Sequence, residues 1–192
     1  PGCLISSADA IKRAGSTGKA FYFTQVRVVN EAGVDVGNDE SGEVLIKGPN
    51  VMVGYWNRPE ATAEAIVDGW LHTGDVASMD EISCIWIVDR KKDMIISGGL
   101  NVYPKEIESI LDKINGVTES AVIGVPHADF GEAVVAVIVC DDIKAKNGPL
   151  SEKQIIAEMK TTIAGFKVPK QIHFVDALPR NTMGKVQKNI LR

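Results

Sequence analysis

The residue best suited to act on an anion is Lys185, which follows Gly184 in the loop Leu178-Pro-Arg-Asn-Thr-Met-Gly-Lys-Val-Gln-Lys188. A lysine on a loop can be delivered late to a substrate, which suits stabilisation of charge that develops in a transition state. The plainer interpretation is a solvated cationic tail, because basic residues cluster at this end of the chain. Composition alone favours that interpretation, so the loop needs support from other motifs.

A candidate acid follows a hydrophobic segment in Leu71-His-Thr-Gly-Asp75. An ionised aspartate has lone pairs for two donors, so Asp75 could accept both hydroxyls of a ribose. A Gly-Asp turn is commonly structural, and by itself this segment favours the structural interpretation.

The segment from Val88 to Glu108 places Arg90, a charged run, Gly98 and Gly99 just before a helix that starts with proline. Two glycines allow another molecule to approach the backbone closely. A tight left-handed turn explains the same glycines, and the residues alone leave both interpretations open.

The two halves of the chain that carry these motifs show different patterns of predicted secondary structure. In the first half apolar residues alternate with period two, which predicts a small antiparallel sheet or barrel. A short helix is expected over residues 59–66, with Asn57 as its cap. The alternating positions are Val26, Val28, Val44, Ile46, Ile85 and Ile87.

After Arg90 strands mix with helices, so we expect α+β architecture with domains at residues 1–91 and 92–192. A helix is expected over residues 104–114 and another from Ser151, where Gln154 completes a capping box. Strands are expected at residues 94–97, 120–125, 133–140 and 171–175, followed by the loop that carries Lys185.

Composition excludes several classes of function. The chain has 192 residues, with 21 Lys and Arg against 25 Asp and Glu and a net charge of −4, which argues against nucleic acid as a partner. No apolar stretch approaches the roughly 20 residues that a transmembrane helix needs. Three scattered cysteines indicate neither a disulfide framework nor a metal site, so we expect a soluble, cytoplasmic protein. The chain opens with Pro1, which suggests a fragment.

The motifs in this order resemble the acyl-adenylate-forming family of acyl-CoA synthetases, adenylation domains and luciferases. The resemblance covers essentially the whole chain and is strongest at residues 42–56, 71–75, 89–108 and 179–185. Residues 122–132 and 178–192 look most similar to malonyl-CoA and fatty-acyl-CoA ligases. Asp89 stands where the family usually has glycine, which leaves Arg90 in register. The implied fold is a β-barrel-like subdomain followed by a C-terminal α+β lid domain.

The resemblance implies a role for each candidate residue. Asp75 holds the ribose hydroxyls with help from Arg90, and Lys185 bridges the acid carboxylate and the α-phosphate. Lys92 is the hinge of the lid. The residues implied to bind CoA are Gly98, Gly99, Phe130, Phe166 and Lys167.

The implied reaction joins malonate or a fatty acid to AMP and then to CoA, with ATP, Mg²⁺ and coenzyme A as cofactors. The family's phosphate-binding loop has no counterpart here: Gly15-Ser-Thr-Gly18-Lys19 has the wrong spacing for one. We therefore expect this chain alone to be inactive. An amino-acid adenylation domain, a luciferase-like enzyme and a non-catalytic binding module remain alternatives, and a homodimer is compatible with the sequence.

Overall fold

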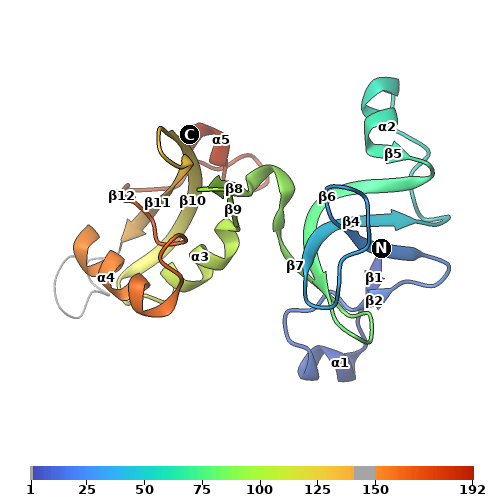
Figure 1. Ribbon diagram of the computed structural model, residues 1–192, viewed down its shortest axis with the longest axis horizontal. Helices are drawn as coiled ribbons and strands as arrows, with labels where there is room; N and C mark the ends of the chain where they lie inside the picture. The colour runs from blue at the N-terminus through green and yellow to red at the C-terminus, as the bar shows by residue number, and fades with distance from the viewer. Residues whose placement is uncertain (1, 141–149) are drawn as a thin grey trace. The chain divides into compact units, whose positions relative to one another are not determined.

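The structure, a computed structural model, describes residues 2–140 and 150–192. The chain divides into two compact units, Pro1–Lys92 and Asp93–Arg192, which we call unit 1 and unit 2. The division predicted from the sequence, between residues 91 and 92, lies one residue earlier. Figure 1 labels most of the helices and strands of both units.

Unit 1 is built on a five-stranded antiparallel sheet in the order β3-β4-β6-β5, with β7 also paired to β6. Two further strands, β1 and β2, pair with each other. The strands are β1 (Cys3–Leu4), β2 (Lys19–Ala20), β3 (Gln25–Val29), β4 (Ser41–Lys47), β5 (Ile66–Val67), β6 (Trp70–Met79) and β7 (Ile85–Arg90). The expected barrel-like closure is not found, because β3 and β7 lie at opposite ends of the sheet and do not pair within the described residues.

Strand β6 runs without a break through the Leu71–Asp75 motif, in which the sequence favours a Gly-Asp turn after a hydrophobic segment. Gly74 has a φ of 69°, in the left-handed region, and the register with β4 shifts between Glu43 and Leu45. An irregularity of this kind re-aims side chains inside a strand. Asp75 therefore sits on a kinked but continuous strand.

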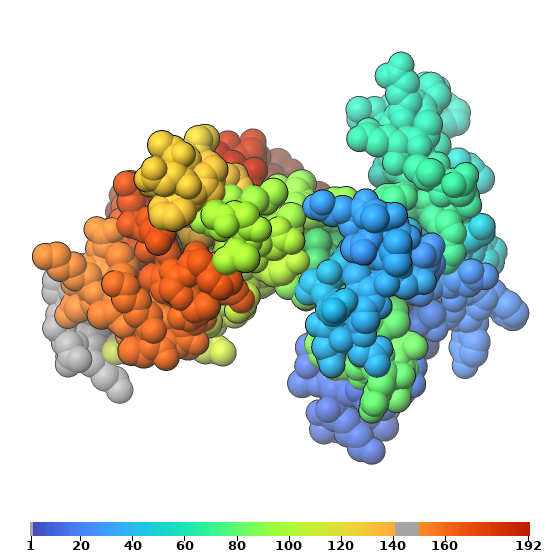
Figure 2. All heavy atoms as spheres, viewed as in Figure 1, coloured from blue at the N-terminus to red at the C-terminus, as the bar shows by residue number. Residues whose placement is uncertain are grey.

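Two short helices belong to unit 1: α1 (Ser7–Lys12) and α2 (Pro59–Ala65). Pro59 begins α2, as expected, but the cap is Arg58 and its side chain makes no capping hydrogen bond. The prediction of Asn57 as the cap is wrong, because that residue has a φ of 53° and lies one position before the cap, Arg58. Figure 2 shows α2 and the loop before it projecting from the rest of unit 1.

Unit 2 confirms the predicted α+β class. Its five-stranded sheet has the order β10-β11-β8-β9, and β12 pairs in parallel with β11. The elements, after the short 3₁₀ helix η1 (Lys91–Asp93), are β8 (Ile95–Ser97), β9 (Leu100–Val102), α3 (Pro104–Leu111), β10 (Val117–His127), β11 (Gly131–Cys140), α4 (Glu152–Thr162), β12 (Gln171–Phe174) and α5 (Lys188–Leu191).

The two faces of this sheet are covered by different parts of the chain. Alternate residues of a strand point to opposite faces. Val122 of β10 belongs to the core that includes Ile107 of α3 and Ile155 of α4. Its neighbour Ala121 belongs instead to a smaller cluster with Leu178, Val186 and Leu191. The C-terminal segment that carries Lys185 therefore covers the face opposite the helices.

The two helices of the main core differ in how well local signals predicted them. The capping box of α4 is confirmed, with Ser151 Oγ accepting from Gln154 N and Gln154 Oε1 accepting from Ser151 N. Helix α3 ends at Leu111, three residues before the predicted end at Ile114. The amide of Ile114 donates to the Leu111 carbonyl, so the chain continues from the helix into a turn. None of the described helices is long and apolar enough to cross a membrane.

Candidate functional site

The loop around Lys185 is organised by Asn181. Its side-chain Oδ1 accepts from the backbone amides of Met183, at 3.0 Å, and Lys185, at 2.9 Å. The Asn181 amide donates to the Lys185 carbonyl at 2.9 Å, and the Gly184 amide donates to the Asn181 carbonyl at 2.9 Å. Gly184 has a φ of 76°, which favours glycine. The backbone of Lys185 is therefore held by local hydrogen bonds rather than left as a free tail.

Arg180 closes the base of this loop. Its guanidinium donates to the Gly184 carbonyl at 2.6 Å and pairs with the Glu119 carboxylate of β10. Arg180 and Val186 also form an antiparallel bridge. The Lys185 side chain is exposed and has no ion-pair partner in residues 2–140 and 150–192. The hydrogen-bonded loop thus presents the ammonium group of Lys185 to solvent.

In unit 1 the structure brings together the two residues expected to bind nucleotide. Asp75 of β6 lies opposite Arg90 of β7 in the antiparallel register. Arg90 Nε lies 2.7 Å from Asp75 Oδ1, and the two side chains are 56% and 29% exposed. The Asp75 amide donates to Thr73 Oγ1 at 3.1 Å. The carboxylate therefore has a fixed position and an accessible edge that can accept hydroxyl donors.

Next to Asp75 lies a pocket of about 440 Å³, lined by Glu43, Tyr55, Ala61, Glu64, Ala65, His72, Thr73, Gly74 and Lys91. Its central group is Glu43, whose side chain is 12% exposed. Glu43 Oε2 lies 2.9 Å from Lys91 Nζ and 3.5 Å from His72 Nδ1. Glu43 Oε1 accepts from the Gly74 amide at 3.3 Å. One carboxylate thus ties the kink of β6 to the residue that follows β7.

The charges around Glu43 decide its ionisation. Burial acts to raise the pKa of Glu43, but the hydrogen bond and positive charge of Lys91, together with His72, outweigh burial and hold that pKa below its usual value. Glu43 is therefore an ionised carboxylate at neutral pH.

Glu43 and Lys91 carry no sequence motif that predicts a role for them. The available signal was a single carboxylate between Gly42 and the apolar run Val44, Leu45 and Ile46. A charge in such a position requires a partner. Identifying Lys91 as that partner requires knowledge of how the strands pair.

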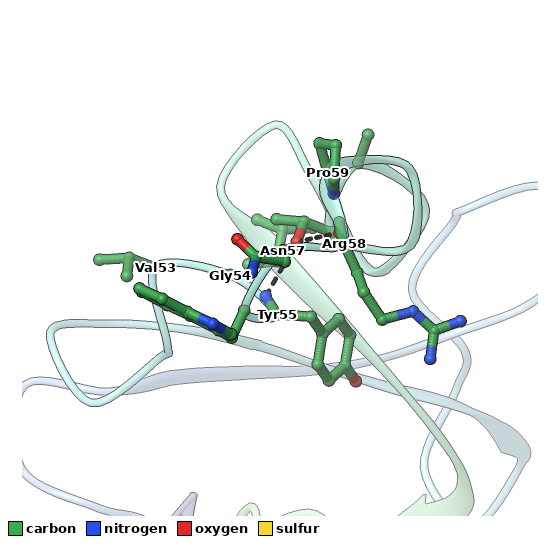
Figure 3. A pocket seen from close by; sticks show the side chains of 10 residues that line it. Val53, Gly54, Tyr55, Asn57, Arg58 and Pro59 are labelled. Carbon is green, nitrogen blue, oxygen red and sulfur yellow. Dashed lines mark hydrogen bonds between the residues drawn. The ribbon is translucent and has the colours of Figure 1, made fainter.

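A larger hollow of about 710 Å³ lies between the loop at residues 53–58 and α2. Figure 3 shows its lining, including the hydrogen bonds from the Tyr55 amide to Thr62 Oγ1, at 2.9 Å, and from Thr62 Oγ1 to the Arg58 carbonyl, at 2.8 Å. The predicted site residues line neither this hollow nor the pocket around Glu43. We place the candidate site at the Glu43 pocket, because its lining residues Gly74 and Lys91 directly adjoin Asp75 and Arg90 in the chain, and because fixed charges meet there.

Lys92, the predicted hinge, lies in η1 and is the last residue of unit 1. Its side chain is exposed. The residue before it, Lys91, is tied to Glu43, whereas the residue after it, Asp93, belongs to unit 2. The chain is thus anchored on one side of Lys92 by an ion pair.

Gly98 and Gly99 form the two-residue turn between β8 and β9, with φ values of 59° and 78°. Positive φ at both central positions is the geometry of a hairpin turn that matches strand twist. A Cβ at Gly99 would meet nothing within 4 Å, whereas one at Gly98 would lie 3.8 Å from the Phe130 ring. The Gly98 amide donates to the Phe130 carbonyl at 2.8 Å. The turn explains the two glycines and also places them beside Phe130.

The remaining CoA candidates are Phe130, next to this turn, and the pair Phe166 and Lys167. Phe130 is 38% exposed and contacts His127, with ring centroids 4.9 Å apart. Phe166 packs against the main core and lies 5.8 Å from the Lys167 ammonium. Lys167 Nζ is paired with both carboxylate oxygens of Glu106, at 2.7 and 2.8 Å. An anion that binds Lys167 must therefore share it with Glu106.

Comparison with known proteins identifies the family models that the chain matches. Residues 1–56 match the family model described as AMP-binding enzyme, and residues 106–185 match the AMP-binding enzyme C-terminal domain. The chain is 46% identical to the long-chain-fatty-acid–CoA ligase FadD13 of Mycobacterium tuberculosis over its whole length, but it covers 37% of that protein.

Two solved structures extend the comparison. ATP-bound MatB from Rhodopseudomonas palustris is 49% identical, with a TM-score of 0.84 over 93% of this chain and 35% of that one. The o-succinylbenzoate CoA synthetase MenE of Bacillus subtilis, in complex with its acyl-adenylate intermediate, is 32% identical, with a TM-score of 0.90 over 100% of this chain and 38% of that one. The chain therefore spans little more than a third of the proteins it matches.

The Glu43 cluster leads to a pH-dependent prediction. Glu43→Gln should lower the free energy of unfolding at pH 7 by about 1 kcal/mol, a modest value because Lys91 is half exposed. Since the folded pKa is depressed, this contribution is complete above the ordinary value of 4.5 and is lost as the pH falls through the lower folded value. Urea unfolding from pH 7 to about pH 3 measures it.

The matched control is Glu64→Gln, which removes an exposed carboxylate from the lining of the same pocket. Its effect on unfolding should be small and should not vary with pH in this way. A Glu43→Gln effect that is the same at both ends of the pH range would contradict the assignment of a lowered pKa to Glu43.

Proposed function

We propose that this chain, which belongs to the AMP-binding enzyme family, is the C-terminal part of an ATP-dependent acid:CoA ligase. The proposal rests on the presence of two groups whose positions are held by local contacts. They are the Asp75–Arg90 ion pair in unit 1 and the exposed Lys185, on a hydrogen-bonded loop, in unit 2. Both belong to segments that the family resemblance singles out. The names of FadD13 and MenE, which are both CoA ligases or synthetases, support the same class.

The proposed reaction has two steps. In the first, a carboxylate oxygen of the acid attacks the α-phosphorus of ATP, and pyrophosphate leaves. In the second, the CoA sulfur attacks the carbonyl carbon of the acyl-adenylate, and AMP leaves with the bridging oxygen. Charge develops at phosphorus in the first step and at the carbonyl oxygen in the second, so the two steps need different groups.

Asp75 and Arg90 are assigned to the nucleotide. The carboxylate accepts the two ribose hydroxyls through lone pairs that Arg90 Nε does not use, and the ion pair with Arg90 orients the Asp75 carboxylate. Mg²⁺ accompanies ATP as a counter-ion to its phosphates, and no step is assigned to it.

Lys185 is assigned to adenylation. An ammonium group is a compact point charge with three donors, and it can contact the attacking carboxylate and an α-phosphate oxygen together. The hydrogen bonds from Asn181 hold its backbone, so little ordering is needed when the substrates arrive.

The second step is assigned to CoA bound on unit 2. Gly98 and Gly99 leave space beside the backbone for the pantetheine chain, and Phe130 offers an exposed ring to the adenine. Phe166 and Lys167 are proposed to contact the phosphates of the CoA nucleotide. The Lys167 ammonium would then be shared between a phosphate and the Glu106 carboxylate. Lys92 is the proposed hinge that brings unit 2 into place for each step.

The proposed acid is malonate or a fatty acid. The fatty-acid choice is supported by the name of FadD13. The chain itself is proposed to be inactive, because its 192 residues contain no phosphate-binding loop. The cytoplasm is the proposed compartment, because three scattered cysteines do not make the pattern of a disulfide framework.

Replacement of Lys185 separates the two steps. In a ligase that contains this chain, Lys185→Ala should slow acid-dependent pyrophosphate release by at least about 100-fold, roughly 2.7 kcal/mol in the barrier. Thioester formation from supplied acyl-AMP should stay within a few fold of the unchanged enzyme, because the lysine acts where phosphorus gains charge.

Lys160→Ala, which removes an exposed lysine from α4, is the matched control and should affect neither step. The 192 residues alone should release no pyrophosphate. Equal losses in both steps for Lys185→Ala would show that the lysine is not specific to adenylation.

The hinge is tested by Lys92→Pro, with Lys92→Ala as control. Proline fixes φ and should restrict rotation at this residue, so thioester formation should fall while pyrophosphate release continues. Alanine leaves φ free and should permit both steps. Normal rates for both steps in the proline variant would place the hinge at another residue.

A further inference from the structure

A buried ion pair joins the C-terminal segment to the first helix of unit 2. Glu108 of α3 is 6% exposed, and its Oε1 lies 2.7 Å from Lys188 Nζ. The same oxygen accepts from the Val122 amide of β10 at 2.9 Å. The Lys188 side chain is 17% exposed, so both charges are largely removed from water. Helix α3, strand β10 and the C-terminal segment therefore meet at one carboxylate.

This pair constrains the chain more strongly than a surface ion pair does. Removing one partner of a buried pair leaves an uncompensated charge, which is costly. Lys105 cannot replace Lys188, because its ammonium lies 3.9 Å from the other carboxylate oxygen and its side chain is 65% exposed. Lys188 is thus the main cation that holds Glu108, and Glu108 in turn fixes the place of Lys188.

Lys188 lies three residues after Lys185, and the intervening residues are also fastened. The Gln187 amide donates to the Pro179 carbonyl at 2.8 Å, and Val186 packs into the cluster formed by Ala121 and Val137. Both residues between Lys185 and Lys188 are therefore held in place by contacts of their own. A displacement of Lys188 must therefore move Lys185.

We propose that Glu108 and Lys188 are positioning residues that set the place of Lys185 on unit 2. They touch neither substrate nor reacting atoms and act through the backbone of the loop. The catalytic consequence rests on the proposed function, whereas the positional claim concerns this chain alone. The two claims are therefore tested separately.

The positional test measures amide hydrogen exchange in the 192-residue chain. Lys188→Met keeps the length and apolar stem of the side chain but removes its charge. The amides of Gly184, Lys185 and Gln187 should then exchange at least about tenfold faster, because the loop opens more often. Lys188→Arg should restore slow exchange, since it keeps the cation.

Lys105→Met is the matched control, because it removes a nearby positive charge that is not on the C-terminal segment. It should leave exchange in the loop unchanged. Slow exchange at the same three amides in Lys188→Met overturns the positional claim. If that variant does not fold, as judged from the amides of β10 and β11, Glu108→Gln answers the same question, because glutamine retains the acceptor for Val122.

The catalytic test measures both half-reactions in a ligase that contains this chain. Lys188→Met should slow pyrophosphate release at least tenfold at saturating ATP, with KM for ATP unchanged, and should spare thioester formation from supplied acyl-AMP. Lys188→Arg should recover most of the rate. Equal losses in both half-reactions, or no loss, overturn the positioning role, whereas an unchanged enzyme that releases no pyrophosphate with any acid refutes the proposed function itself.

Discussion

The antiparallel pairing of β6 with β7 is the constraint on which the proposed nucleotide site depends. It sets Asp75 opposite Arg90, and it ends where Lys91 reaches the Glu43 carboxylate. The kink at Gly74 lies on the same strand, and Glu43 also holds its amide. A single register therefore orients the proposed ribose acceptor and anchors the chain just before Lys92. A slip of one residue would turn these side chains to the opposite face.

Unit 2 uses the two faces of its sheet for different purposes. The helices α3 and α4 cover one face and make a core of fully buried residues such as Ile107 and Ile155. The C-terminal segment covers the other face through a much smaller cluster. Because that cluster is small, polar contacts at Arg180 and Lys188 carry much of the positioning of the loop. Such polar contacts can hold the loop in position while they leave the Lys185 side chain exposed.

Sequence reasoning worked where the signal is local. The capping box at Ser151 and Gln154 and the helix that begins at Pro104 depend on residues a few positions apart, and both are found. It failed where the outcome depends on strand pairing: the Leu71–Asp75 motif is a continuous strand, and the sheet of unit 1 is open. The Glu43–Lys91 and Glu108–Lys188 pairs join distant segments, so no spacing rule could reveal them. The roles of Asp75, Arg90 and Lys185 came from the resemblance of their motifs, and they stay predictions.

The central claim is that the acid is activated by bonding to AMP, and transfer of a labelled oxygen tests this most directly. A ligase that contains this chain is supplied with ATP, CoA and an acid labelled with ¹⁸O at both oxygens of its carboxylate, and the products are analysed by mass spectrometry. Since the bridging oxygen leaves with AMP, we predict one ¹⁸O in each AMP and none in pyrophosphate. Label in inorganic phosphate, with ADP as the nucleotide product, would show that the acid is activated as an acyl phosphate and would contradict the account.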